Sequence, residues 1–214
     1  MPSASPGSIP KLYALADWEA LEGTSLAEAA CRMADAGVRW IQIRAKNVGD
    51  DELAAGVEDC CRALEGSEAE LWLNDRPDLA RMFPVRGVHL GQDDLAPAAA
   101  RPFLGESSWI GLSTHGRGQV EEADADPAVD VVAIGPVFDT TGKKNPEPVI
   151  GLDGVRRARA ATGKPLVAIG GIDRGRIREV LAAGADSVAI LSAICRGSIE
   201  RNCRRLVALA EATV

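Results

Sequence analysis

The chain has 214 residues, a formal net charge of −7, and 46% hydrophobic but only 4% aromatic residues. A chain of this length holds one α/β barrel or one to two smaller domains. The negative charge argues against a nucleic-acid partner, and no apolar run approaches the roughly 20 residues of a membrane span. The low aromatic content predicts a core of aliphatic side chains.

The N-terminal segment MPSASPGSIP lacks the basic and apolar regions of a signal peptide. We therefore expect residues 1–10 to form a short disordered tail and residues 11–214 to form a single domain. The five cysteines show no metal-ligand spacing, so we interpret them as reduced thiols of a cytoplasmic protein. The sequence leaves open whether copies of the chain form a homo-oligomer.

Short apolar runs alternate with amphipathic segments along the whole chain. Eight strands are expected, at Leu12–Leu15, Trp40–Arg44, Glu70–Asn74, Gly87–Leu90, Trp109–Leu112, Val131–Ile134, Leu166–Ile169 and Ser187–Ile190. Helices are expected at Ser25–Ala36, Asp50–Leu64, Gly118–Ala125, Leu152–Ala161 and Asp173–Ala183, with Ser25 and Asp173 as N-caps and Gly37 and Gly184 as C-caps. This alternation predicts a parallel sheet, and eight units favour a closed (β/α)₈ TIM barrel.

Polar residues at the end of the second expected strand suit a diphosphate. The active sites of such barrels lie at the C-terminal ends of the strands. Gln42 and Arg44 share one face of their strand, and Lys46 follows directly. An arginine can fork onto phosphate oxygens, which favours a diphosphate ligand, although a surface ion pair would use the same residues.

Acidic residues follow the third and fourth expected strands. Asn74 and Asp75 end one of them, and Asp93 and Asp94 come shortly after the other. Carboxylates from neighbouring strand ends can converge on Mg²⁺, which binds one or two carboxylates together with substrate phosphates. Each acid alone also fits a helix N-cap. Their occurrence beside two cations favours a Mg²⁺–diphosphate site.

The two last expected strands end in small residues. The run Ala168–Ile172 contains a Gly pair that lets backbone N–H groups approach a ligand, and a side chain at Gly171 is expected to occupy the ligand's space. Together with the end of the run Ser187–Ser192, this pattern is typical of the phosphate-binding corner of a (β/α)₈ barrel. Ser113, at the end of the fifth strand, is a neutral donor and acceptor suited to the edge of a heterocycle.

One long polar loop, at 139–150, is rich in Gly and Pro and is predicted to be a functional lid. Thr140 and Lys143 lie on this loop, where a lysine is able to clamp phosphate. The simpler interpretation of the same residues is a solvent-exposed loop whose charges only keep the protein soluble.

An ordered set of motifs over about residues 11–211 resembles the thiamine-phosphate synthase family. The motifs are QIRAK at 42–46, NDRPDLA at 74–80, GVHLGQDD at 87–94, GLSTH at 111–115, GPVF at 135–138 with Thr140 and Lys143, AIGGI at 168–172, and AGAD at 183–186 followed by Leu191 and Ser192. Each motif alone is modest, but the ordered set is highly specific.

The resemblance implies a transferase with two small-molecule substrates. The family condenses 4-amino-2-methyl-5-hydroxymethylpyrimidine diphosphate with 4-methyl-5-(2-hydroxyethyl)thiazole phosphate, and it releases thiamine phosphate and diphosphate. By resemblance, the pyrimidine diphosphate contacts Gln42, Arg44, Lys46, Asn74 and Lys143, with Ser113 at the pyrimidine. The thiazole phosphate contacts Thr140, Gly171, Leu191 and Ser192, and Asp75 and Asp94 hold Mg²⁺. Arg44, Lys46, Lys143 and Ser113 are the implied catalytic residues.

The chain departs from the family pattern at one position. The family often has a second hydroxyl residue two positions after Thr140, where this chain has Gly142, with Thr141 just before it. Three other readings stay open. A thiazole tautomerase of the same superfamily would lack the Gln92–Asp94 segment and carry His at Pro136. A non-catalytic phosphate-binding barrel would not need the acids and cations together. A phosphosugar isomerase or epimerase would need a Glu or Cys base at a strand end.

Overall fold

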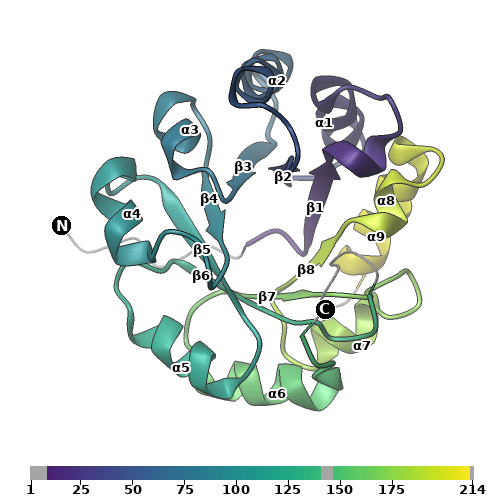
Figure 1. Ribbon diagram of the computed structural model, residues 1–214. Coiled ribbons are helices and arrows are strands. Elements are labelled where there is room, and N and C mark those ends of the chain that lie inside the picture. The colour runs from purple at the N-terminus through teal and green to yellow at the C-terminus, as the bar shows by residue number, and fades with distance from the viewer. Residues whose placement is uncertain (1–8, 141–146, 213–214) are drawn as a thin grey trace.

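The computed structural model describes residues 9–140 and 147–212, which form a closed barrel of eight parallel strands surrounded by helices (Figure 1). Each strand pairs with its neighbours in the chain, and the last pairs with the first. The strands are β1 (Leu12–Asp17), β2 (Trp40–Arg44), β3 (Glu70–Asn74), β4 (Gly87–Leu90), β5 (Trp109–Thr114), β6 (Val131–Ile134), β7 (Leu166–Ile169) and β8 (Ser187–Ile190). The predicted (β/α)₈ TIM barrel is confirmed.

The helices form the outer ring. They are α1 (Leu26–Asp35), α2 (Asp50–Ala63), α3 (Pro77–Met82), α4 (Pro97–Leu104), α5 (Arg117–Ala125), α6 (Gly151–Ala161), α7 (Ile177–Ala182), α8 (Ser192–Cys195) and α9 (Ile199–Glu211), with a 3₁₀ helix η1 at Trp18–Leu21. In Figure 1 the yellow α9 lies beside the purple α1, which closes the ring. None of the described helices is long and apolar enough to cross a membrane.

Local sequence signals set the ends of several helices. The Ser25 Oγ accepts a hydrogen bond from the Glu28 N–H at 3.2 Å, which confirms the N-cap of α1. Gly37 and Gly184 follow the C-caps of α1 and α7 with φ of +89° and +109°. This left-handed conformation favours glycine because a side chain would be strained there, and both helices end one residue before the predicted position.

The predicted start of α7 at Asp173 is wrong, because the helix begins at Ile177. The Asp173 Oδ1 accepts from the Gly175 N–H at 2.9 Å, and the Asp173 carbonyl oxygen accepts from the Arg176 N–H at 3.0 Å. An Asp that bonds to the backbone two residues on closes a tight turn, which competes with helix formation. The cap signal therefore belongs to a turn that precedes the helix.

Two strands are longer at their C-terminal ends than the apolar runs that predicted them. β1 continues to Asp17 and β5 to Thr114, and polar residues end both strands. Parallel pairing sets these ends, since Asp17 stands opposite Arg44 in β2, and Thr114 stands opposite Ile134 in β6. The extension of β5 places Ser113 within a strand, where its neighbours hold the backbone in place.

The barrel interior contains aromatic as well as aliphatic residues, whereas the sequence predicted an aliphatic core. Aliphatic residues do fill the layer between strands and helices. Within the interior, four rings form what we call the aromatic plug: Tyr13, Trp40, Trp72 and Trp109. They fit because residues as small as Ala133 and Ala189 face the same space from other strands. Ile9 is buried against the plug, although the sequence analysis assigned it to the tail.

The cysteines are all free, as expected for reduced thiols. Burial is the main cause that raises the pKa of the Cys60 thiol and of the Cys203 thiol to about 12 each. Thiols with such high pKa values remain protonated and unreactive at neutral pH. They serve as packing residues behind the strands.

Candidate active site

A cavity of about 460 Å³ opens at the C-terminal ends of the strands. It lies among the strand ends of β1, β2 and β5–β8 and the residues that follow them. Six of the residues predicted from the sequence line it: Arg44, Ser113, Thr140, Gly171, Leu191 and Ser192. Residues as far apart in the chain as Leu15 and Arg196 therefore meet in one cavity.

Arg44 forms an ion pair with Asp17 at the wall of this cavity. The Asp17 side chain is 6% exposed, and its Oδ1 also accepts from the Ala20 N–H at 3.2 Å. A partly buried arginine that is held in this way presents its remaining N–H donors in a fixed direction. The sequence analysis missed Asp17, although a polar residue at the end of the first strand was the signal that could have found it.

Lys46, Asp75 and Asp94 form a connected polar group, in which we call Asp75 and Asp94 the acidic pair. The Lys46 Nζ lies 3.2 Å from the Asp75 Oδ2, and Asp75 shares a hydrogen bond with Asp94. Burial, followed by the hydrogen bond to Asp94, raises the pKa of the Asp75 carboxyl. The Gly91 N–H donates to the Asp94 Oδ2 at 2.7 Å, which holds the second carboxylate in place.

The acidic pair fits a magnesium ion that also binds substrate. Among residues 9–140 and 147–212, no group of three or more His, Cys, Asp and Glu side chains is placed to hold a metal. An ion at Asp75 and Asp94 would thus complete its coordination with water and phosphate oxygens, as Mg²⁺ usually does. Two carboxylates held together repel one another, and a cation between them relieves that repulsion.

Gln42 and Asn74 do not line the 460 Å³ cavity. Gln42 is 3% exposed, and its Nε2 donates to the Tyr13 hydroxyl at 2.9 Å, at the top of the aromatic plug. Asn74 ends β3 opposite His89 of β4. These two residues therefore lie beneath or beside the cavity rather than in its wall.

Replacement of Tyr13 by phenylalanine is expected to lower the free energy of unfolding by about 1 kcal/mol, because the buried Gln42 amide loses its acceptor. Urea denaturation measures the change. The double variant Tyr13→Phe/Gln42→Leu removes both partners, so the two substitutions should be non-additive. Strictly additive effects would show that the hydrogen bond does not stabilise the barrel.

Ser113 is held by two side chains from the neighbouring unit of the barrel. Its Oγ lies 2.9 Å from the His89 Nε2, and its carbonyl oxygen accepts from the Gln92 Nε2 at 2.6 Å. His115 also lines the cavity, and its Nδ1 lies 2.7 Å from the Gly135 carbonyl oxygen. The hydroxyl of Ser113 thus has a defined position at the cavity wall.

The loops after β7 and β8, which were predicted to form a phosphate corner, both line the cavity. Gly170 and Gly171 have φ of +102° and +63°, and they line the cavity with Leu191 and Ser192. Ser192 begins α8, and the first N–H groups of any helix have no acceptor within it. The corner therefore combines a Gly turn and a helix start, two backbone features that suit an anion.

The structure adds a second constraint on Gly171. A Cβ at this position would meet the loop after β6, because it would lie 2.4 Å from the Asp139 carbonyl oxygen and 2.8 Å from the Phe138 Cβ. The loop after β7 is pressed against the loop after β6, and glycine is the residue that permits this approach. The long loop contributes Thr140 to the cavity, whereas Thr141, Gly142, Lys143 and Lys144 lie outside the described residues.

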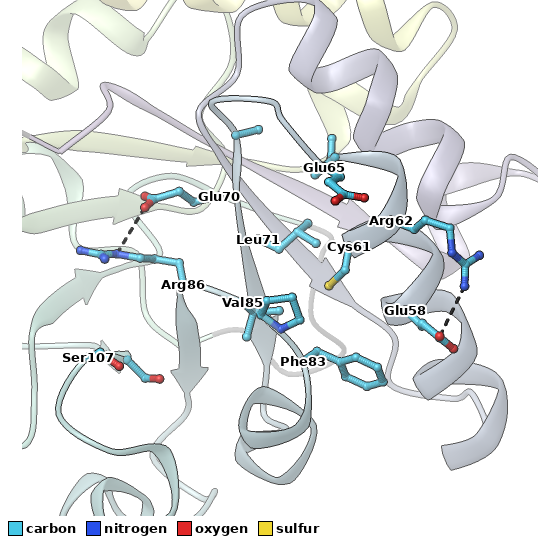
Figure 2. Close-up of a pocket in the computed structure, with 14 residues that line it drawn as sticks. Glu58, Cys61, Arg62, Glu65, Glu70, Leu71, Phe83, Val85, Arg86 and Ser107 are labelled. Atoms are coloured by element: carbon cyan, nitrogen blue, oxygen red, sulfur yellow. Dashed lines mark ion pairs between the residues drawn. The ribbon is translucent and has the colours of Figure 1, made fainter.

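A larger hollow, of about 810 Å³, lies at the opposite end of the barrel, beside the starts of β3, β4 and β5 (Figure 2). Its two labelled arginines each face a carboxylate, with Arg86 3.7 Å from Glu70 and Arg62 3.3 Å from Glu58. Active sites of (β/α)₈ barrels lie at the C-terminal ends of the strands. We therefore assign the site to the smaller cavity at that end.

Comparison with known proteins finds a family match over most of the chain. The family model described as "Thiamine monophosphate synthase" matches residues 12–194. The chain is 44% identical over 193 residues to the thiamine-phosphate synthase of Koribacter versatilis, covering 88% of this chain and 90% of that protein. It is 38% identical over 193 residues to the enzyme of Agrobacterium fabrum, covering 88% and 87% of the two chains.

A solved structure shares the whole barrel. It is a thiamine phosphate pyrophosphorylase from Pyrococcus furiosus, which superposes with a TM-score of 0.85 at 28% sequence identity and covers 95% of this chain and 96% of its own. The family model spans most of the chain, and the curated relatives agree over nearly the same residues. The chain belongs to the thiamine-phosphate synthase family.

Proposed function

We propose that this chain is a thiamine-phosphate synthase that joins 4-amino-2-methyl-5-hydroxymethylpyrimidine diphosphate to 4-methyl-5-(2-hydroxyethyl)thiazole phosphate. The products are thiamine phosphate and diphosphate. Family membership supports the reaction. The observation that carries the proposal within this chain is one cavity that contains Arg44, Ser113 and the phosphate corner.

The diphosphate is proposed to lie between β2 and the acidic pair. Arg44 and Lys46 supply positive charge, and Asn74 supplies an amide donor at the end of β3. Each cation faces a carboxylate in the structure, Asp17 for Arg44 and Asp75 for Lys46. Mg²⁺ held by Asp75 and Asp94 would offset the charge of the diphosphate and make it a better leaving group.

The pyrimidine is proposed to contact Ser113. The hydroxyl both donates and accepts, which suits an aminopyrimidine edge, and His89 fixes its position. Gln42 lies deeper, where its amide donates a hydrogen bond to the Tyr13 hydroxyl. The thiazole phosphate is proposed to bind Thr140, Gly171, Leu191 and Ser192, partly through backbone N–H groups.

The proposed chemistry is dissociative. The bond between the pyrimidine methylene carbon and the diphosphate oxygen breaks first, and its electron pair leaves with the diphosphate. The methylene cation is stabilised by the aminopyrimidine ring, and the thiazole nitrogen then donates a pair to form the new C–N bond. The protein needs no nucleophile for this path, and its main tasks are to stabilise the leaving group and to exclude water.

The test is to incubate the purified protein with both substrates and Mg²⁺ and to detect thiamine phosphate by chromatography. Formation of thiamine phosphate that depends on both substrates supports the proposal. Isomerisation of the thiazole phosphate without the diphosphate substrate would indicate the tautomerase. Binding of both substrates without turnover would indicate a non-catalytic barrel.

A further inference from the structure

Arg176 lies just before α7 and joins two loops that border the cavity. Its Nη1 donates to the Gly171 carbonyl oxygen at 2.7 Å, and its guanidinium carbon lies 4.4 Å from the centre of the Phe138 ring. Gly171 follows β7, whereas Phe138 follows β6. One side chain therefore connects the loops of two neighbouring strands.

These loops also contact each other directly. The Phe138 N–H donates to the Gly170 carbonyl oxygen at 3.0 Å, and the Val137 N–H donates to the Ile169 carbonyl oxygen at 2.9 Å. The α-carbon of Gly171 packs so closely on Phe138 that a Cβ would overlap it. Arg176 covers this contact by stacking on the ring, an arrangement that favours arginine because its guanidinium is planar.

The hydrogen bond from Arg176 sets the direction of one peptide group. In a trans peptide the C=O and the N–H point in opposite directions, and the bond between Gly171 and Ile172 is trans. Since Arg176 holds the carbonyl oxygen, the Ile172 N–H points away from Arg176. Gly171 and Ile172 line the cavity and Arg176 does not, which is the arrangement expected if this N–H faces the cavity.

We propose that Arg176 is a positioning residue for the thiazole phosphate. It orients the Gly171–Ile172 peptide so that a backbone donor meets the phosphate, and it holds the Phe138 loop against that peptide. The inference rests on the proposed function, because that function identifies the phosphate at this corner. It concerns one substrate only, since the diphosphate residues Arg44 and Lys46 belong to β2 and the segment after it.

The first test compares Arg176→Met with Arg178→Met. Arg178 is exposed two residues further on, in α7, so its loss removes the same charge without touching either loop. We expect Arg176→Met to raise the KM for thiazole phosphate at least about tenfold, with the KM for pyrimidine diphosphate within about twofold of the unmodified protein. Arg178→Met should leave both KM values within about twofold.

Two results would overturn the proposal in this experiment. An equal rise of the thiazole phosphate KM in both variants would show that only the long-range charge matters. An equal rise of both KM values in Arg176→Met would show a general structural role. The melting temperature of each variant measures how far the substitution destabilises the barrel.

Arg176→Lys separates charge from geometry. A lysine keeps the charge but has neither the planar face for Phe138 nor the fork that reaches Gly171 from that position. We expect its thiazole phosphate KM to lie nearer to that of Arg176→Met than to that of the unmodified protein. A KM equal to that of the unmodified protein would refute the positioning role.

Calorimetric titration with inorganic phosphate makes failure of this inference distinguishable from failure of the proposed function. We expect phosphate to bind the unmodified protein and Arg178→Met alike, and to bind Arg176→Met more weakly. A protein that makes no thiamine phosphate but shows this pattern would refute the synthase proposal and retain the role of Arg176. Equal phosphate affinity in all three proteins, or no phosphate binding by the unmodified protein, would overturn the inference.

Discussion

Asp94→Asn is expected to lower turnover at least about tenfold, because one of the two carboxylates that would hold Mg²⁺ is lost. The asparagine keeps an oxygen for the Gly91 N–H, so the loop after β4 should remain in place. Asp75→Asn should act in the same direction. Asp75 has φ of +63°, a left-handed conformation that asparagine adopts more readily than most residues, so backbone strain does not confuse the result.

The matched control is Asp93→Asn, since Asp93 is the exposed neighbour of Asp94. Steady-state assays at several Mg²⁺ concentrations measure the effect, and EDTA should abolish activity until Mg²⁺ is added back. The variants at Asp75 and Asp94 should need more Mg²⁺ than the control. Full activity in EDTA, or an Asp93→Asn variant as impaired as Asp94→Asn, would remove the metal from the acidic pair.

Gly171→Val is expected to raise the KM for thiazole phosphate more than the KM for pyrimidine diphosphate, by at least about tenfold for the former. Two causes act together. The φ of +63° is strained for a β-branched residue, and the new Cβ would lie 2.4 Å from the Asp139 carbonyl oxygen. The loops after β6 and β7 must then separate, which displaces the backbone donors of the phosphate corner.

Gly175→Val in the same loop is the control, because a Cβ there would lie 3.4 Å from its nearest neighbour, the Asp173 Oδ1. Separate KM measurements for the two substrates decide the outcome. If Gly171→Val weakens both substrates equally, the division between a diphosphate side and a thiazole phosphate side is wrong. If the KM values of Gly171→Val match those of Gly175→Val, the loops tolerate separation and the phosphate corner is not tightly packed.

The elements of the fold follow from local patterns. A strand buried on both faces is mostly apolar, so each of the eight strands is visible as a short, mostly apolar run, and six of them have the predicted ends. Ser25 and Gly37 mark the ends of α1 for equally local reasons. Asp173 failed as a cap because the same residue type also closes turns, and residues further along decide between the two.

Only some of the site residues can be predicted from local sequence patterns. Arg44, Ser113 and Gly171 were predicted because chemistry in such barrels lies at strand ends, and they do line one cavity. Asp17 and Arg176 were not predicted. Asp17 matters because β1 lies beside β2, and Arg176 matters because α7 begins beside the loop after β6.

The sequence by itself determined the alternation of strand and helix, the parallel barrel and the identity of the residues at its mouth, because these depend on residue type and spacing along the chain. Only the tertiary structure decided which residues are partners. Closure of the barrel brings the rings of β1, β2, β3 and β5 into one aromatic plug, and the pairing of β6 with β7 brings Phe138 beside Gly171 and Arg176. Contacts between separate strands and loops depend on register and side-chain direction in three dimensions, and no local pattern in the sequence records them.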